Sequence, residues 1–252
     1  MIKRHTYILE KLKNKQHISV NELCEELNIS AVTIRKDFTF LEQKGLLYRT
    51  YGGASMHNPY TKEISVLEKE KISFYEKNMI GKTASGLIAN QDTIIMASGT
   101  TVQFMAEHIA FDLDLVVITS SLKVALELTK REKINVIQLG GEVRNSSNST
   151  AGYHAELFLK DISCDKLFLG VDGIDFSYGI TTSNVAEVLL NKKMISCAKE
   201  VIVVSDSSKF MKRGFGKISD LDIINTLVTD EKISEVLVKQ LEELGINVII
   251  AK

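Results

Sequence analysis

The segment 18–54 constrains the fold most, because its pattern predicts two short helices separated by a tight turn. Ser19 and Glu22 form an S-x-x-E capping box, which predicts that a helix begins near Val20. Asn28 interrupts the helical spacing of the apolar residues, so this first helix should end there. A second apolar pattern begins directly afterwards, which leaves room only for a tight turn.

The second helix has a cap, a buried stripe and a stop signal of its own. Ser30 is placed to cap it, and Ile34, Phe38 and Leu41 recur at i, i+4 and i+7 as its buried stripe. Gly45 stands where a glycine commonly ends a helix. Two short helices joined in this way predict a helix-turn-helix.

The side chains off this stripe suit contact with DNA. Thr33, Arg35, Lys36 and Thr39 are polar or basic, and they can reach phosphates or base edges. The same pattern also fits an ordinary charged surface helix, and spacing alone leaves both interpretations open.

The sequence TIRKDFTFLEQKGLLYRTYGGA resembles the signature of the DeoR family of bacterial transcription regulators. That signature joins a T-I-R-[RK]-D-[LF] recognition helix to a short wing that ends R-x-[HY]-G-G-A. Tyr51 replaces the usual wing histidine, and a tyrosine can still donate to a phosphate. The resemblance implies these DNA-binding residues: Ser30, Thr33, Arg35, Lys36, Thr39, Arg49 and Tyr51.

Length and composition fit a soluble globular protein with two domains or one large one. The chain has 252 residues, of which 44% are hydrophobic and 25% charged. No run of 18 apolar residues occurs, and the N-terminus MIKRHTYILEKLKNK lacks an apolar signal core. We therefore expect no membrane helix, no export and a cytoplasmic location. Cys24, Cys164 and Cys197 are widely spaced, so buried thiols are expected rather than disulfides or a zinc site.

Charge is divided unevenly along the chain. The net charge of −1 separates into +3 up to Met56 and −4 beyond it. A basic head on an acidic body fits a nucleic-acid contact that is confined to the head.

The flanking segments complete a winged helix and a linker. A first helix is expected from Arg4 to Lys15, with Tyr7, Ile8 and Leu12 on its apolar face, and a short β segment from Leu46 to Tyr51. The polar stretch around Pro59 predicts a domain boundary. The predicted domains are a winged helix-turn-helix at 1–56, a linker or connecting helix that helps to pair subunits at 57–78, and a sugar-phosphate-sensing α/β domain at 79–252.

From Met79 onward, apolar β-type runs alternate with amphipathic helical runs. Such alternation predicts an α/β domain with a mostly parallel sheet that helices cover on both faces.

Five of these predicted strands end in small or polar clusters. They run into Ser98–Gly99–Thr100–Thr101, Thr119–Ser120–Ser121, Gly140–Gly141–Glu142–Val143–Arg144, Asp172–Gly173–Ile174–Asp175 and Ser205–Asp206–Ser207–Ser208–Lys209. Ligands of parallel sheets bind beyond the carboxyl ends of the strands, and hydroxyls with helix N-termini suit phosphate. Helix caps and tight turns use the same residues, so each cluster alone is a weak signal. Together they predict a pocket for a small, phosphorylated, hydroxyl-rich molecule.

The motifs SGTT, TSS, GGEVR, DGID and SDSSKF resemble the sensor domain of DeoR-family regulators. That domain is similar in fold to ribose-5-phosphate isomerase and glucosamine-6-phosphate deaminase. The resemblance implies these effector-binding residues: Ser98, Gly99, Thr100, Thr101, Thr119, Ser120, Gly140, Gly141, Arg144, Asp172, Asp175, Glu187 and Lys209. Glu187 falls near the catalytic glutamate of the isomerases, whereas Tyr178 stands where they have a lysine. The resemblance thus implies sugar-phosphate binding with an incomplete acid–base set.

Two functions remain open at this point. The first is a transcription regulator that is not an enzyme: it binds a double-stranded operator, represses genes of carbohydrate use and responds to a phosphorylated sugar. An activator in place of a repressor is a variant of this reading. The alternative is a sugar-phosphate isomerase or deaminase with an accessory N-terminal domain. We expect a homo-oligomer, a dimer or a tetramer, because one small winged helix makes few contacts with DNA. No cofactor, metal or membrane partner is expected.

Overall fold

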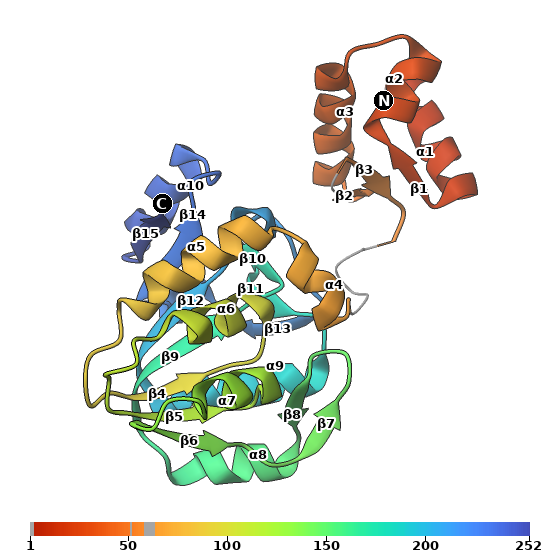
Figure 1. Cartoon of the computed structure of the whole chain (residues 1–252). Helices are drawn as coiled ribbons and strands as arrows, with labels where there is room; N and C mark the ends of the chain where they lie inside the picture. The colour runs from red at the N-terminus through yellow and green to blue at the C-terminus, as the bar shows by residue number, and fades with distance from the viewer. Residues whose placement is uncertain (1–2, 51, 58–63) are drawn as a thin grey trace. The chain divides into compact units, whose positions relative to one another are not determined.

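The computed structural model of the chain describes residues 3–50, 52–57 and 64–252. It divides into two compact units, an N-terminal unit at Met1–Lys62 and a C-terminal unit at Glu63–Lys252 (Figure 1). The predicted boundary at Pro59 lies outside the described residues, and the domain bounds of 1–56, 57–78 and 79–252 remain predictions.

The N-terminal unit is a winged helix-turn-helix, as predicted. Its elements are α1 (Lys3–Lys15), β1 (His17–Ser19), α2 (Val20–Leu27), α3 (Ala31–Gln43), β2 (Tyr48–Thr50) and β3 (Gly53–Ser55). The three strands form a small antiparallel sheet in the order β1-β3-β2, and β2 with β3 makes the wing (Figure 1).

Local hydrogen bonds fix the ends of α2 and α3. The Ser19 hydroxyl accepts from the Glu22 N–H at 3.1 Å, and the Ser30 hydroxyl accepts from the Thr33 N–H at 3.3 Å. At the other end of α3, the Gly45 N–H donates to the Glu42 carbonyl at 2.8 Å, and the Leu46 N–H donates to the Leu41 carbonyl at 3.0 Å. This is a Schellman motif, and it confirms the predicted stop at Gly45.

Two predicted details of the N-terminal unit are wrong. The Glu22 carboxylate does not turn back to close a capping box, because Lys11 and Lys15 hold it at 2.8 and 2.6 Å. Their hydrogen bonds lower the pKa of Glu22 to about 2. Tyr7 is 41% exposed rather than part of the core, and its hydroxyl donates to Glu26 at 3.0 Å.

The predicted stripe of α3 forms the core of this unit. Ile34, Phe38 and Leu41 are at most 1% exposed, and they cluster with Ile8 and Leu12 of α1. The remaining face of α3 is therefore free to carry polar side chains.

A buried charge fixes α3 against α1. Asp37 is only 6% exposed, and its carboxylate accepts from the Arg4 guanidinium at 2.8 Å and lies 3.0 Å from His5 Nε2. Burial alone would raise the pKa of Asp37, but the hydrogen bonds from Arg4 and His5 outweigh it and hold the pKa below its ordinary value. The aspartate of the T-I-R-K-D motif is thus a structural anchor.

The second glycine of the wing is required by close packing. A Cβ atom on Gly53 would lie 2.2 Å from the carbonyl oxygen of Ile18, in the neighbouring strand β1. Any side chain there would push the wing away from the helices.

The C-terminal unit is an α/β domain built on a seven-stranded parallel sheet, which confirms the predicted fold class. The strand order is β15-β14-β12-β9-β4-β5-β6. These strands are β4 (Thr93–Met96), β5 (Leu115–Thr119), β6 (Ile134–Gln138), β9 (Cys164–Gly170), β12 (Ala198–Val204), β14 (Thr226–Asp230) and β15 (Asn247–Ala251).

Helices cover both faces of this sheet. They are α5 (Phe74–Ser85), α6 (Thr100–His108), α7 (Leu122–Leu128), α8 (Tyr153–Phe158), α9 (Val185–Cys197) and α10 (Glu235–Glu243). One buried cluster joins the sheet to α5, α6 and α7 through Ile80, Met105 and Val124. A second joins the other face to α8, α9 and α10 through side chains such as Met194 and Leu241. Figure 1 shows α5 and α6 side by side over the sheet.

The direction of the chain through the sheet reverses between β4 and β9. From β4 the chain adds β5 and then β6 on one side; it then returns to place β9 on the other side of β4, followed by β12, β14 and β15. This reversal is a topological switch point, where open parallel sheets bind their ligands.

Several elements near this edge were not predicted from the sequence. The segment 57–78, expected to be a linker or a connecting helix, contains in its described part α4 (Val66–Lys71) and the start of α5, with Ser73 at a φ of 52° between them. The other additions are the hairpin of β7 (Glu142–Arg144) with β8 (Ser149–Ala151), and a three-stranded sheet of β10 (Gly173–Asp175), β11 (Gly179–Thr182) and β13 (Gly216–Ser219). Three short 3-10 helices occur at Leu159–Asp161 (η1), Ser207–Lys209 (η2) and Leu221–Ile223 (η3).

The cysteines agree in part with the expectation of buried thiols. Cys164 and Cys197 are buried free thiols, while Cys24 is a partly exposed one. Within the described ranges, no helix is both long and apolar enough to cross a membrane.

Replacing the buried anchor, Asp37→Asn, should destabilise the N-terminal unit by about 1.5–3 kcal/mol, the range for a charge-assisted hydrogen bond. Because the pKa of Asp37 is lowered, the difference in unfolding free energy between wild type and variant should be fully present above the ordinary pKa of 3.8. It should shrink as the pH falls below that value. Hydrogen exchange of the α3 amides measures it. The exposed Glu25→Gln on α2 is the control, and equal protection in both variants would contradict the anchor.

Candidate DNA-binding surface and ligand pocket

The exposed face of α3 carries a shallow groove. It is lined by Val32, Arg35, Lys36, Thr39, Phe40 and Gln43. Three of the predicted DNA-binding residues, Arg35, Lys36 and Thr39, therefore share one surface. Val32, Phe40 and Gln43 were missed, although they fall on the same helical face at spacings of three, four and seven residues from the predicted ones. Val32 is 60% exposed, and an apolar side chain at such a position can contact a thymine methyl group.

Ser30 and Thr33 lie at the N-terminus of α3. Their hydroxyl oxygens are 3.0 Å apart, and Ser30 is the helix cap. A helix N-terminus with two hydroxyls suits contact with a DNA phosphate.

Arg49 connects the wing to α3. Its guanidinium donates to the Thr39 hydroxyl at 3.0 Å, and its backbone N–H donates to the Glu42 carboxylate at 2.8 Å. Arg49 thus lies beside the groove. The remaining predicted residue, Tyr51, lies outside the described residues.

The C-terminal unit contains a cavity of about 60 Å³ at the carboxyl ends of β4, β9 and β12, beside the switch point. It is lined by Ile64, Val66, Lys69, Lys77, Ser98, Gly99, Thr100, Thr101, Ser146, Ser147, Gly170, Val171, Asp172, Thr182, Ser183, Glu187 and Lys209. We call this cavity the switch-point pocket.

The structure brings most of the predicted effector-binding residues together. Ser98, Gly99, Thr100, Thr101, Asp172, Glu187 and Lys209 line the switch-point pocket. Arg144 is not part of the wall, but its guanidinium lies 2.5 Å from the Glu187 carboxylate and supports it.

Five predicted residues are not in the pocket wall: Thr119, Ser120, Gly140, Gly141 and Asp175. The first four follow β5 and β6, which lie on the outer side of β4, away from β9 and β12. Asp175 pairs instead with Arg213 at 2.9 Å and accepts from the Ser177 hydroxyl at 2.8 Å. We therefore leave these five out of the site.

Sequence reasoning missed several pocket residues: Lys69, Lys77, Ser146, Ser147, Thr182 and Ser183. The two lysines come from α4 and α5, ahead of the first strand of the sheet. The Thr-Thr-Ser sequence at 181–183 follows a glycine turn, so it could have been predicted to contact a ligand. The two lysines lie in a charge-rich segment, where the sequence does not distinguish them from surface lysines.

One wall of the pocket is the N-terminus of α6. Gly99 caps this helix at a φ of 128°, a conformation that favours glycine. No side chain among the described residues makes a cap hydrogen bond there. The first N–H groups of α6, beginning at Thr100, therefore have no partner within the helix, and they favour an anion.

Lysines supply positive charge to the same cavity. Lys77 is 3% exposed, and its ammonium donates to the carbonyl oxygens of Lys69 and Ile72 at 2.5 and 2.7 Å. Burial lowers the pKa of Lys77 to about 8. Lys69 and Lys209 line the pocket with it, so three ammonium groups face the Asp172 and Glu187 carboxylates.

Both carboxylates of the pocket are held by donors. Asp172 receives hydrogen bonds from Lys69 at 2.6 Å and from the backbone N–H and hydroxyl of Ser183 at 3.0 and 2.9 Å. Burial alone would raise the pKa of Asp172, but the charges of Lys69 and Lys209 outweigh it and hold the pKa far below its usual range. Glu187 accepts from the Thr182 hydroxyl at 2.9 Å besides its pair with Arg144.

This arrangement suits recognition of an anionic, hydroxyl-rich molecule. The lysines and the α6 N-terminus supply donors for an anion, while carboxylates and hydroxyls can bond sugar hydroxyls. Among the described residues, no group of three His, Cys, Asp or Glu side chains could hold a metal ion.

Comparisons with known proteins agree with both units. Residues 4–59 match the DeoR-like helix-turn-helix domain family, and residues 73–231 match the DeoR C terminal sensor domain family. A protein of Escherichia coli O157:H7 named for transcriptional repression of the aga operon is 35% identical over 98% of this chain and 93% of its own length.

Two further relatives are similar over most of their length. The HTH-type transcriptional repressor GlcR of Bacillus subtilis (strain 168) is 32% identical over 97% of this chain and 94% of its own. The lactose phosphotransferase system repressor of Staphylococcus epidermidis is 34% identical over 88% of this chain and 89% of its own.

Among solved structures, ribose 5-phosphate isomerase A from Methanocaldococcus jannaschii matches 54% of this chain and 54% of its own, with 17% identity and a TM-score of 0.40. A similarity of this size supports no inference about activity. The two family matches and the full-length relatives rest on far more of the chain, and they show that this protein belongs to the DeoR family of transcription regulators, with a DeoR-like helix-turn-helix domain and a DeoR C-terminal sensor domain.

Proposed function

We propose that the protein represses genes of carbohydrate use, and that a phosphorylated sugar bound in the switch-point pocket modulates its affinity for an operator. The observation that carries this proposal is the convergence of Lys69, Lys77 and Lys209 with the N-terminus of α6 on one polar cavity. Four sources of positive charge around one small site favour a ligand with a doubly charged group.

The names of the relatives support repression and sugar metabolism. One is named for the lactose phosphotransferase system and several are named repressors. The hydroxyl-rich wall of Ser98, Thr182 and Ser183 suits the sugar part of such a ligand.

The alternative of an isomerase or deaminase is disfavoured by the relatives, which are transcription regulators. The site supports the same conclusion. The lowered pKa of Asp172 keeps this group ionised at neutral pH, where it cannot donate a proton. Glu187 is already neutralised by Arg144.

Operator binding also implies an assembly and a location. A winged helix of this size gains useful specificity when two copies bind paired half-sites, so we propose a homo-oligomer, a dimer or a tetramer. Since its DNA partner lies there, the protein would act in the cytoplasm.

Arg35→Ala should weaken operator binding at least tenfold without unfolding the N-terminal unit. Arg35 is exposed beside the buried stripe, and one base-contacting arginine contributes about 1–3 kcal/mol of discrimination in each half-site. Binding at fixed salt to a duplex selected by the protein from a random pool measures the effect. Lys13→Ala, an exposed cation on α1, is the control. Unchanged affinity of the Arg35 variant would remove α3 from the interface.

Lys209→Ala and Thr100→Val should leave operator binding near wild type when no ligand is present. The effector concentration that releases the operator should rise roughly ten- to a hundredfold, because a charge-assisted hydrogen bond contributes about 1.5–3 kcal/mol. Titration of ribose 5-phosphate, glucose 6-phosphate and glucosamine 6-phosphate into operator complexes tests this. Lys217→Ala, whose partner Asp220 lies outside the pocket wall, is the control. Equal sensitivity of all variants would overturn the pocket assignment.

Effector binding should weaken as the pH rises above about 8. Lys77 loses its proton there, because burial lowers its pKa to about 8; the other charges that act on it are those of Asp206, Lys209, Lys69 and Asp172. A phosphate dianion raises the pKa of Lys77, so binding is full below 8 and falls by up to about tenfold per pH unit above it.

The matching variant for this pH dependence is Lys77→Met, which cannot carry the charge. It should bind the same sugar phosphate more weakly and with a flat profile between pH 7 and 9, as measured by isothermal titration. A steep alkaline decline in that variant would show that another group is responsible.

A further inference from the structure

We propose that residues 64–71, which we call the strap, close the switch-point pocket and are displaced when a sugar phosphate binds. This inference rests on the proposed function and adds a route by which the ligand acts. The strap consists of residues 64 and 65 followed by α4, and Ile64, Val66 and Lys69 form part of the pocket wall.

The size of the cavity requires that a wall move. Its volume is about 60 Å³. Sites for small molecules typically enclose roughly 300–1,000 Å³, and one water molecule occupies about 30 Å³ in the liquid. The closed pocket therefore has room for a couple of water molecules and not for a sugar phosphate.

The strap is the wall that can move at least cost. The opposite walls are the ends of the central strands β4, β9 and β12 and the first turns of α6 and α9, which belong to the two buried clusters of the sheet. The turn between β7 and β8 also lines the pocket, at Ser146 and Ser147, and the strap is hydrogen-bonded to it through Val66. The strap packs only Val66 fully against the unit, whereas Leu67 is 59% exposed and Ile64 is 36% exposed. A helix of six residues is also unstable without tertiary contacts.

Polar contacts hold the strap shut. Lys69 pairs with Asp172 at 2.6 Å, and Lys77 donates to the carbonyl oxygens of Lys69 and Ile72 at the C-terminal end of α4. The Val66 N–H donates to the Ser146 carbonyl at 2.6 Å.

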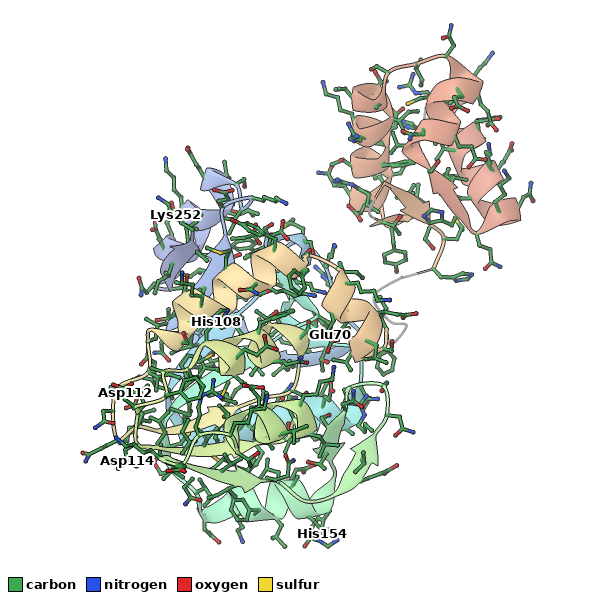
Figure 2. The ribbon with its side chains drawn as sticks, viewed as in Figure 1. Glu70, His108, Asp112, Asp114, His154 and Lys252 are labelled. Atoms are coloured by element: carbon green, nitrogen blue, oxygen red, sulfur yellow. The ribbon has the colours of Figure 1, made fainter. Side chains whose placement is uncertain are left out.

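A further ion pair lies outside the pocket. It joins Glu70 on α4 to Lys123 on α7, and neither residue lines the cavity. Figure 2 shows Glu70 on α4, well separated from His154 on α8.

A phosphate can compete for the donors that hold the strap. Lys69 can exchange the Asp172 carboxylate for a phosphate oxygen, since both are anionic acceptors. Asp172 keeps its hydrogen bonds from the backbone N–H and the hydroxyl of Ser183. Lys77, already in the cavity, gains an anionic partner in place of the carbonyl oxygens. Lys209, whose charge also acts on Asp172, remains in the pocket wall when Lys69 turns to the ligand.

The strap is placed to transmit this change along the chain. Residue 64 directly follows the segment that joins the two units. A ligand that favours the open strap acts on the attachment point of the DNA-binding unit, and its effect on operator affinity cannot exceed its preference for that state.

The test loosens the strap from outside the pocket. Lys123→Met and Glu70→Gln each remove the outer ion pair, so the closed state loses one contact that the open state lacks. The control is Lys166→Met, which removes a pair with Asp92 of similar burial at the opposite end of the sheet. Operator release is titrated with whichever of ribose 5-phosphate, glucose 6-phosphate and glucosamine 6-phosphate releases wild type best.

Both strap variants should need about two- to fivefold less sugar phosphate for release than wild type, the range expected for one partly exposed ion pair, while the control should match wild type. In wild type, the sugar phosphate should also speed deuterium exchange of the Val66 amide. If wild type responds but the strap variants titrate like the control, the strap proposal is wrong and the proposed function stands. If no sugar phosphate releases wild type, the proposed function falls, and the strap with it.

Discussion

The parallel pairing of β4 with β9 is the constraint on which the sensor unit depends. These strands lie about 70 residues apart in sequence, and Ile95 is paired with Leu167 between them. The pairing creates the switch point, because β5 and β6 extend the sheet on one side and β12 on the other. It brings the α6 N-terminus beside Asp172 and Lys209, so a site for an anionic ligand forms from segments that no local pattern connects.

Charge balance explains why this site can be both closed and responsive. Three lysines around a small cavity would repel one another, and in the absence of ligand the Asp172 carboxylate offsets part of this charge through its ion pair with Lys69. Lys69 belongs both to the strap, through α4, and to the pocket, where it contacts Asp172. A ligand phosphate competes for the same donor that holds the strap, which links occupancy of the pocket to the segment leading to the DNA-binding unit.

Local signals were predictable from the sequence, and long-range order was not. The Ser30 cap, the Ile34 stripe and the Gly45 stop depend on residues a few positions apart, so the winged helix followed directly. The clusters after β5 and β6 were wrongly assigned to the pocket, because no single strand encodes its place in the sheet. Thr119 and Gly140 follow strands that lie beyond β4, away from the pocket. Lys77 was missed because burial lowers its pKa, and the segments that surround it are distant in the sequence.

The most direct measurement is a crystal structure of the full chain with the sugar phosphate that best releases the operator. The phosphate should lie within hydrogen-bond distance of Lys77, Lys209 and the first N–H groups of α6, and Lys69 should have turned from Asp172 to the ligand. The pocket should also be enlarged, with residues 64–71 displaced. A ligand bound elsewhere, or bound here beneath a strap that has not moved, would contradict this proposal.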